Sequence, residues 1–180
     1  MSPIRLLLTP EDRDAPERVR RLRRLGVGQR AEAAFDVFAD RLAEAVPAPY
    51  AMVNFIGVER QFLAGLHMPD DRPLAPAADD GPGRRLPRDH GFCPHVVVRR
   101  KALVLDDVRD YPRFAGNAVV ADTGIRAYLG APLLDRTGLP LGTICVADLR
   151  PRRWGRTGLD TVKSLAAELA TRIEQRGEVS

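Results

Sequence analysis

The sequence predicts an α/β (α+β) domain with a central, mostly antiparallel sheet. Two observations carry this prediction: apolar runs of strand length separated by turn residues, and amphipathic patterns of helical length near both ends of the chain. Their order is helix, two strands, long loop, short helix, strand, crossover, hairpin and helix. This order favours terminal helices on one face of the sheet and crossover loops on the other. A chain of 180 residues fits one domain of ordinary size.

The first expected elements are helices. Pro16 suits the first turn of a short helix, which Gly26 would end. A second helix is expected over about 29–46, because Phe35 and Phe38 begin an apolar stripe at helical spacing.

The strands follow in two groups. Residues 50–57 form a nearly unbroken apolar run, which suits a central strand buried on both faces. The turn residues at 135–138 predict a hairpin late in the chain. The other strands are expected at 61–67, 102–106, 127–134 and 139–148, before a C-terminal helix at about 157–176.

The segment 68–89 reads as a long loop. It holds five prolines, two glycines and five aspartates in 22 residues, with little periodicity. Loops of this length without secondary structure are usually lids, binding loops or disordered connectors. A short helix is expected to begin at Pro94, and an irregular crossover to cover 107–124.

The charge pattern argues against several classes of partner. The formal net charge is +4, and the one dense basic run is the arginine-rich stretch 18–24. We interpret it as an amphipathic helix with solvated arginines; a nucleic-acid surface is the alternative, which the absence of interleaved aromatic residues disfavours. No apolar run approaches the roughly 18 residues of a membrane helix, so no membrane association is expected. Two cysteines do not make a disulfide framework, which indicates a cytoplasmic protein.

Four segments together resemble the core of a GAF domain: GFCPH (91–95), DYPRFAGN (110–117), IRAYLGAPL (125–133) and LGTICVAD (141–148). The similarity covers about 20–176 and is to the GAF domains of bacterial sensor kinases and diguanylate cyclases. It implies a sheet of five to six strands, with N- and C-terminal helices on one face and crossover loops with short helices on the other. The GAF domain would span 27–176, after an N-terminal arm with the basic helix at 1–26.

The resemblance also implies a pocket between the sheet and the loops at 68–92 and 107–126. We expect a mostly apolar cavity with few polar groups. Arg113 is expected to pair with Asp106 or Asp107; an anionic ligand is its alternative partner. The candidate ligand-binding residues are Phe92, Cys93, His95, Asp106, Arg113, Phe114, Asn117, Arg126, Tyr128 and Cys145.

The cluster of His90, Cys93 and His95 raises the question of a metal. A structural zinc site needs four ligands, and the remaining candidates, His67 and Cys145, are distant in sequence. We therefore expect no metal and no cofactor, with a haem held by one axial histidine as the alternative.

Cys93 precedes Pro94 at an expected helix start, where backbone N–H groups stabilise a thiolate. A branch of GAF-like enzymes reduces free methionine sulfoxide with a Val-Cys-Gly sequence and extra cysteines. This chain has Phe-Cys-Pro and only Cys145 besides. The sequence therefore favours a protein that is not an enzyme, with that reductase as an alternative.

Taken with the resemblance, these patterns predict a stand-alone cytosolic sensor or regulatory module that takes part in signal transduction. It would bind a small molecule or a protein partner without catalysis. The alternatives are a free methionine sulfoxide reductase and a nucleic-acid-binding regulator that uses the arginine-rich helix. We also expect a homodimer built from the terminal helices and a separate signalling partner.

Overall fold

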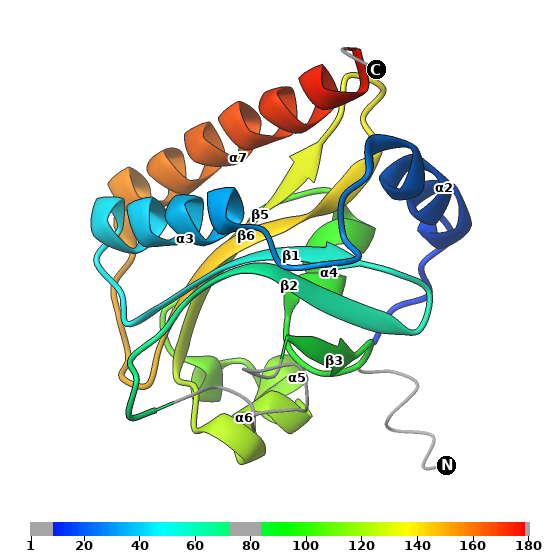
Figure 1. Ribbon diagram of the computed structural model, residues 1–180. Coiled ribbons are helices and arrows are strands. Elements are labelled where there is room, and N and C mark those ends of the chain that lie inside the picture. Colours follow the sequence, from blue (N-terminus) through cyan, green and yellow to red (C-terminus); the bar gives the residue numbers. More distant parts are fainter. Residues whose placement is uncertain (1–8, 73–83, 179–180) are drawn as a thin grey trace.

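A six-stranded antiparallel sheet forms the centre of the molecule, in the order β3-β2-β1-β6-β5-β4 (Figure 1). The computed structural model describes residues 9–72 and 84–178. The strands are β1 (Tyr50–Ile56), β2 (Arg60–His67), β3 (Arg85–Pro87), β4 (Leu103–Leu105), β5 (Ala127–Leu134) and β6 (Pro140–Asp148). The helices are α2 (Ala15–Leu25), α3 (Ala33–Ala45), α4 (Cys93–Arg99), the 3-10 turn η1 (Val108–Asp110), α5 (Pro112–Ala115), α6 (Ala118–Thr123) and α7 (Gly155–Glu178).

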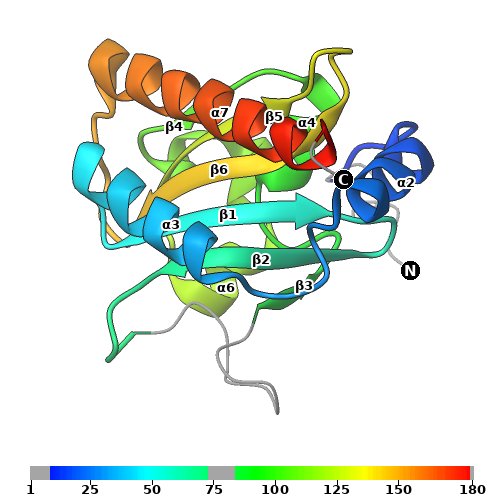
Figure 2. The ribbon, with the colours of Figure 1, turned by 45° about the horizontal axis from the view of Figure 1, so that its top comes forward.

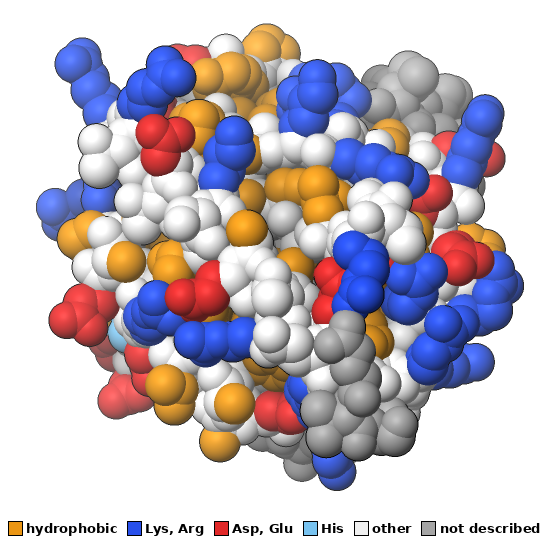
Figure 3. Space-filling model, turned by 90° about the horizontal axis from the view of Figure 1, so that it is seen from above, with side chains coloured by type: hydrophobic (Ala, Val, Ile, Leu, Met, Phe, Trp, Pro, Cys, Tyr) orange, Lys and Arg blue, Asp and Glu red, His pale blue; other side chains and the backbone are white. Residues whose placement is uncertain are grey.

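The helices cover the two faces of the sheet unequally. The long helices α3 and α7 lie on one face, whereas α4, α5 and α6 lie on the other (Figures 1 and 2). This arrangement confirms the predicted fold class. Figure 3 shows lysine and arginine side chains spread over the α3–α7 face, with acidic side chains between them. Arg41 pairs with Glu168 there, with Nη2 and Oε1 3.1 Å apart, and so links α3 to α7.

The central strand β1 is buried along its whole length, as its apolar sequence predicts. Because side chains alternate along a strand, Val53 and Phe55 enter the core beneath α3 and α7. Tyr50, Met52 and Ile56 instead join a second core on the side of α4 to α6. The two cores therefore lie on opposite faces of β1, and the second contains the candidate site described below.

The arginine-rich helix α2 departs from the expectation of solvated arginines. Arg18 is fully buried: its Nε donates to the carbonyl oxygen of Ile56 at 3.1 Å, and its Nη1 donates to Asp12 at 3.0 Å. Arg21 forms an ion pair with the buried Asp135. The prediction was wrong for these two residues, because tertiary contacts bring the carbonyl oxygen and the carboxylates that bind the arginines close to them.

The expected long loop at 68–89 contains a strand that the sequence did not indicate. Residues of β3 pair with Arg60, Gln61 and Phe62 at the edge of the sheet. Three residues are too few to show an alternating pattern, so only the pairing reveals them. Residues 73–83 of this segment lie outside the described residues. In the part of the chain that the structure describes, no helix has the length and apolar character needed to cross a membrane.

Helix α3 packs closely against β2 at Gly65. A Cβ atom there would lie 2.3 Å from the carbonyl oxygen of Phe35, a distance that real Cβ atoms do not show. The backbone of α3 is the obstacle, so no side-chain rotation relieves the clash. By contrast, a Cβ at Gly158 in α7 would meet its nearest heavy atoms at 3.6 Å, an ordinary contact.

We therefore expect Gly65→Ala to lower the free energy of unfolding by about 3 kcal/mol, because the added methyl group overpacks the core. Gly158→Ala is the matched control and should raise it by up to about 1 kcal/mol, because alanine is the better helix former. Urea denaturation followed by circular dichroism measures both. Equal unfolding midpoints for wild type and Gly65→Ala would contradict the close packing.

Candidate functional site

A small, partly open cavity of about 50 Å³ lies on the side of the sheet that α4 and α6 cover. Most of its wall is apolar; the exceptions are two amides, one histidine, one tyrosine and two thiols. The lining residues are Met52, Asn54, Gln61, Leu63, Leu86, His90, Gly91, Phe92, Cys93, Val119, Ile125, Tyr128 and Cys145.

Strand register brings the sheet residues of the cavity together. Met52 lies opposite Cys145, and Asn54 lies opposite Thr143, in the antiparallel pair β1–β6. Directly opposed residues point to the same face of a sheet, so these side chains share one side.

The Tyr128 side chain reaches the cavity because Gly130, two residues further along the same strand, has no side chain. A Cβ at Gly130 would lie 2.3 Å from the Tyr128 hydroxyl oxygen. The phenol ring thus occupies the space that a side chain at position 130 would fill. Its hydroxyl oxygen lies 3.1 Å from the Cys93 sulfur.

Aromatic rings form the wall behind Cys93. The Phe92 ring meets the rings of Tyr128 and Phe114 edge to face, with centroids 5.2 and 5.7 Å apart. His95 packs against Phe114 in the same manner, at 5.0 Å. Edge-to-face pairs stabilise each other beyond the burial of their area. Phe92 therefore lines the cavity, whereas His95 and Phe114 support it from behind.

Asn117 fastens the loop before α4 to the crossover segment. Its Oδ1 accepts from the backbone nitrogens of Gly91, at 2.9 Å, and Val119, at 3.0 Å. Its Nδ2 donates to the carbonyl oxygen of Gly91 at 2.8 Å. One side chain thus caps α6 and holds the segment that leads to Cys93.

The two thiols are close and chemically different. Their sulfurs lie 3.8 Å apart, and both residues are buried. The hydrogen bond with Cys145 lowers the pKa of Cys93 to about 6, against the opposing effect of burial, and the Tyr128 hydroxyl adds to the decrease. The pKa of Cys145 is raised well above its usual value, by the same hydrogen bond and by burial. Of the two thiols, Cys93 is therefore the one whose ionisation the site favours.

An amide pair crosses the floor of the cavity. Asn54 Nδ2 donates to Gln61 Oε1 at 2.8 Å, and Gln61 Nε2 donates to the carbonyl oxygens of Pro87 and His90, at 2.8 and 2.6 Å. Within the described residues, Asn54 Oδ1 and Thr143 Oγ1 are buried without a hydrogen-bond partner. Buried polar atoms are nearly always paired, and Asn54 lines the cavity, so Asn54 Oδ1 can accept a hydrogen bond from a ligand there.

Six of the ten expected site residues lie outside the cavity wall; besides His95, Phe114 and Asn117, these are Asp106, Arg113 and Arg126. Arg126 binds Asp107, with Nη2 and Oδ2 2.8 Å apart, and this contact lowers the pKa of Asp107. Arg113 instead lies over the Phe114 ring, 5.7 Å from its centroid. The expectation that Arg113 pairs with Asp106 or Asp107 was therefore wrong.

Asp106 has a structural role near the end of β4. Its Oδ1 accepts from the backbone nitrogen of Trp154 at 3.3 Å. This contact joins β4 to the segment that leads into α7.

Sequence reasoning missed the amides Asn54 and Gln61. The signal was present, because Asn54 is the one polar residue in the apolar run 50–56. A polar side chain in a strand buried on both faces needs a specific partner. Its partner, Gln61, could be inferred only from the hairpin register.

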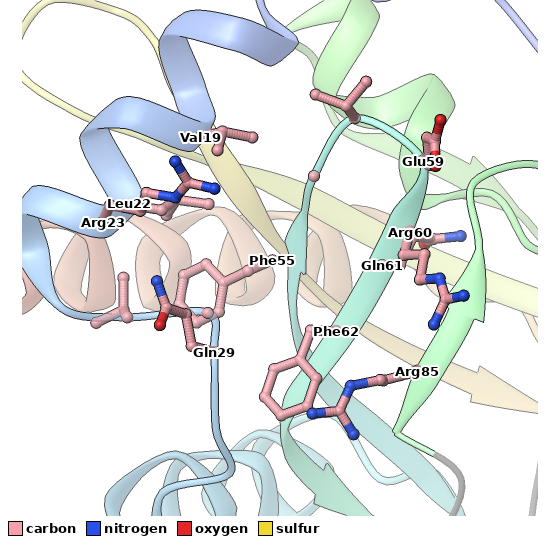
Figure 4. Close-up of a pocket in the computed structure, with 14 residues that line it drawn as sticks. Val19, Leu22, Arg23, Gln29, Phe55, Glu59, Arg60, Gln61, Phe62 and Arg85 are labelled. Carbon is pink, nitrogen blue, oxygen red and sulfur yellow. The ribbon is translucent and has the colours of Figure 1, made fainter.

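A second, larger hollow of about 880 Å³ lies between α2, the α2–α3 connection and the β1–β2 hairpin. Figure 4 shows Arg23 and Gln29 on one side of it, and Phe62 with Arg85 on the other. The Arg85 guanidinium lies over the Phe62 ring, 5.3 Å from its centroid. The wall of this hollow includes the exposed side chains of Arg23, Gln29 and Arg60, which solvent can hydrate. The polar groups of this hollow therefore need a bound ligand less than the buried polar atom of the small cavity does.

Metal-ligating residues do not converge anywhere in the described ranges: no group of three or more histidine, cysteine, aspartate or glutamate residues could hold an ion. His90 pairs with Asp122, with Nε2 and Oδ2 3.2 Å apart, instead of facing Cys93 and His95 as a third ligand.

Comparison with known proteins places this geometry in context. The model of the GAF domain family matches residues 30–173. A cyclic di-GMP phosphodiesterase of Pseudomonas aeruginosa is 31% identical over 133 residues, which cover 70% of this chain. The match spans 20% of that relative's length.

Solved structures share the fold at low identity. The GAF domain of an Acinetobacter phosphoenolpyruvate-protein phosphotransferase matches with a TM-score of 0.63 and 15% identity, over 94% of this chain and 98% of that one. A free methionine-R-sulfoxide reductase of Neisseria meningitidis, in complex with its substrate, matches with a TM-score of 0.64 and 17% identity, over 96% and 97%.

These matches overturn the expectation that the chain is not an enzyme. The relative from Pseudomonas aeruginosa is named as a phosphodiesterase, and the structure from Neisseria meningitidis is named as a reductase. The sequence argument had relied on missing motifs and on the number of cysteines, and neither of these excludes catalysis.

The family-model match over most of the chain, the six-stranded antiparallel sheet and its two helical layers lead to one conclusion: the chain belongs to the GAF domain family.

Proposed function

We propose that this GAF domain is a sensor module in signal transduction, and that it binds a small, mostly apolar molecule in the cavity beside Cys93. One observation carries the proposal: the cavity is small and mostly apolar, yet Asn54 Oδ1 is buried at its wall and has no hydrogen-bond partner among the described residues. A ligand with one hydrogen-bond donor and an apolar body matches such a wall.

The size of the cavity determines how such a ligand enters. A volume of about 50 Å³ holds only a few water-sized molecules, whereas pockets for drug-sized ligands measure about 300–1,000 Å³. A metabolite must therefore displace part of the wall. The segment from β3 to α4 is the part held by side-chain contacts, through Gln61 and Asn117. Ligand binding would move this segment, and its displacement is the signal.

We expect at least one compound from a panel of amino acids, short organic acids and nucleotides to raise the melting temperature of the wild-type protein by several degrees. Asn54→Leu should abolish the increase, because it removes the unpaired acceptor. Differential scanning fluorimetry measures the change. Arg23→Ala, in the open hollow, is the control and should respond as the wild type does. An increase that survives Asn54→Leu and is lost in Arg23→Ala would place the ligand in the hollow and refute the proposal.

The thiols favour a second candidate function, the reduction of free methionine sulfoxide. Cys93 has the lowered pKa of a nucleophile, and Cys145 lies within reach as a resolving thiol. The Cys93 thiolate would attack the sulfoxide sulfur and release methionine and a sulfenic acid. Attack by Cys145 would then give a disulfide and water, and an added dithiol would restore both thiols.

This candidate predicts that the protein releases methionine from methionine-R-sulfoxide when dithiothreitol is the reductant. Cys93→Ser should lose the activity completely, because the nucleophile is gone. Amino-acid analysis of the reaction mixture measures the methionine. Rates of wild type and Cys93→Ser that both equal the rate without protein would exclude the reductase.

We also propose a homodimer that pairs through α3 and α7, and a separate signalling protein as its partner. Val37 of α3 is 65% exposed, and Ala167 of α7 is also exposed. Ala170 of α7, by contrast, is buried in the core, 2% exposed. Val37 is therefore the large apolar side chain that α3 offers to a second copy of the chain.

We expect light scattering to give the mass of a dimer at tens of micromolar protein, and Val37→Glu to give that of a monomer, because a charge at the contact must be desolvated. Val58→Glu is the matched control: Val58 is 53% exposed at the β1–β2 hairpin, away from α3 and α7, and its substitution should leave the mass unchanged. A wild-type monomer, or a dimer that only Val58→Glu dissociates, would refute this interface.

A further inference from the structure

Cys93 and Cys145 are placed so that a small movement joins them. Their sulfurs are 3.8 Å apart, and a disulfide bond measures about 2.05 Å, so the approach required is less than 2 Å. Cys93 is the first residue of α4, and Cys145 lies within β6. A helix end moves more easily than a central strand that is paired on both sides, so Cys93 is the partner that shifts.

The surroundings assign different roles to the two sulfurs. The pKa of Cys93 is lowered to about 6 and that of Cys145 is raised, so Cys93 is the sulfur that ionises more readily and acts as the nucleophile. The Tyr128 hydroxyl, 3.1 Å from the Cys93 sulfur, stabilises the thiolate. A thiolate next to a protonated thiol is the arrangement that redox-sensitive cysteines use.

The cavity selects the oxidant by size. Both sulfurs line a space of about 50 Å³, and one water molecule needs roughly 10–15 Å³ of such space. Hydrogen peroxide is little larger than water, so it fits beside the sulfurs without any displacement of the wall. Cys93 is 6% exposed and Cys145 is fully buried, which keeps larger oxidants away from them.

We propose that Cys93 and Cys145 form a reversible intramolecular disulfide when hydrogen peroxide enters this cavity, which makes the domain a peroxide-responsive module. This modification goes beyond the ligand binding proposed above and does not depend on it. Unlike the reductase candidate, it consumes no sulfoxide substrate.

The chemistry balances in two steps. The Cys93 sulfur attacks one peroxide oxygen and the O–O bond breaks; the departing hydroxide takes the proton that Cys93 lost on ionisation and leaves as water. Cys93 is then a sulfenic acid, oxidised by two electrons. The Cys145 sulfur attacks the Cys93 sulfur, the S–O bond breaks, and the Cys145 proton leaves with the hydroxide as a second water. A dithiol reductant returns both thiols by exchange.

Oxidation would change the cavity itself. The disulfide draws the start of α4 toward β6 and removes the thiolate that the Tyr128 hydroxyl contacts. Phe92, which precedes Cys93 and packs edge to face on Tyr128 and Phe114, must follow this movement. The wall that a ligand would contact is thus different in the oxidised protein.

The test treats the reduced, folded full-length protein with a small molar excess of hydrogen peroxide. Remaining thiols are then alkylated with N-ethylmaleimide under denaturing conditions, and the intact mass is recorded. We expect wild type to lose both alkylation sites, a peptide map to show Cys93 joined to Cys145, and dithiothreitol to restore both sites. Protein that keeps both sites in the folded state, yet loses them when peroxide is added in urea, would overturn the proposal.

Single variants separate the roles of the two sulfurs. Cys145→Ser should stop at the sulfenic acid of Cys93, which dimedone traps as a stable adduct. Cys93→Ser should leave Cys145 alkylatable at the same peroxide dose, because burial still raises the pKa of Cys145 when Cys93 is absent. Tyr128→Phe removes only the hydroxyl; it should still form the disulfide, but several-fold more slowly at neutral pH. Dimedone labelling of Cys145 in Cys93→Ser, or disulfides between molecules instead of within one, would refute the assignment.

Discussion

The pairing of β1 with β6 is the constraint on which the rest of this molecule depends. Both strands are almost wholly buried, so every residue must face one of two cores. The register that sets Met52 against Cys145 sends Val53 and Ile144 to the opposite side, beneath α3 and α7. A slip of one residue would turn one of the two strands over, and would either place Asn54 under the long helices or remove Cys145 from Cys93. The fold and the site are therefore fixed by the same hydrogen-bond ladder.

Local sequence patterns predicted the elements well wherever the pattern was long. The expected strand at 127–134 has the observed limits, and β1, β2, β6, α2 and α3 begin and end within a few residues of expectation. What could not be predicted depends on contacts between distant segments. The strand β3 is too short to have a periodicity of its own, and it exists because β2 offers it an edge. Arg18 looked like one arginine among several, and only the carbonyl group of Ile56 distinguishes it.

In the candidate site, too, some residues could be predicted from local sequence patterns and others depend on contacts between distant segments. The aromatic residues and thiols were recognisable from the sequence. Of these, Phe92, Cys93, Tyr128 and Cys145 meet in the cavity. The contacts of the charged candidates could not be recognised from the sequence. An arginine in a loop has several acidic neighbours in sequence, and only the three-dimensional structure shows which one it pairs with. Arg126 takes Asp107, which leaves Arg113 to lie on Phe114. The polar floor of the cavity requires the hairpin register, which brings Gln61 beside Asn54.

The buried guanidinium of Arg18 links β1 to helix α2. Asn54, at the cavity, and Ile56, whose carbonyl oxygen receives Arg18, are two residues apart on one strand. A fully buried cation cannot give up an acceptor without a large loss of solvation, so α2 must follow that oxygen wherever the strand carries it. A movement of β1 at residue 54 would therefore act on α2 through the hydrogen bond between Ile56 and Arg18. The strand that lines the cavity is thus the same strand that holds the N-terminal helix.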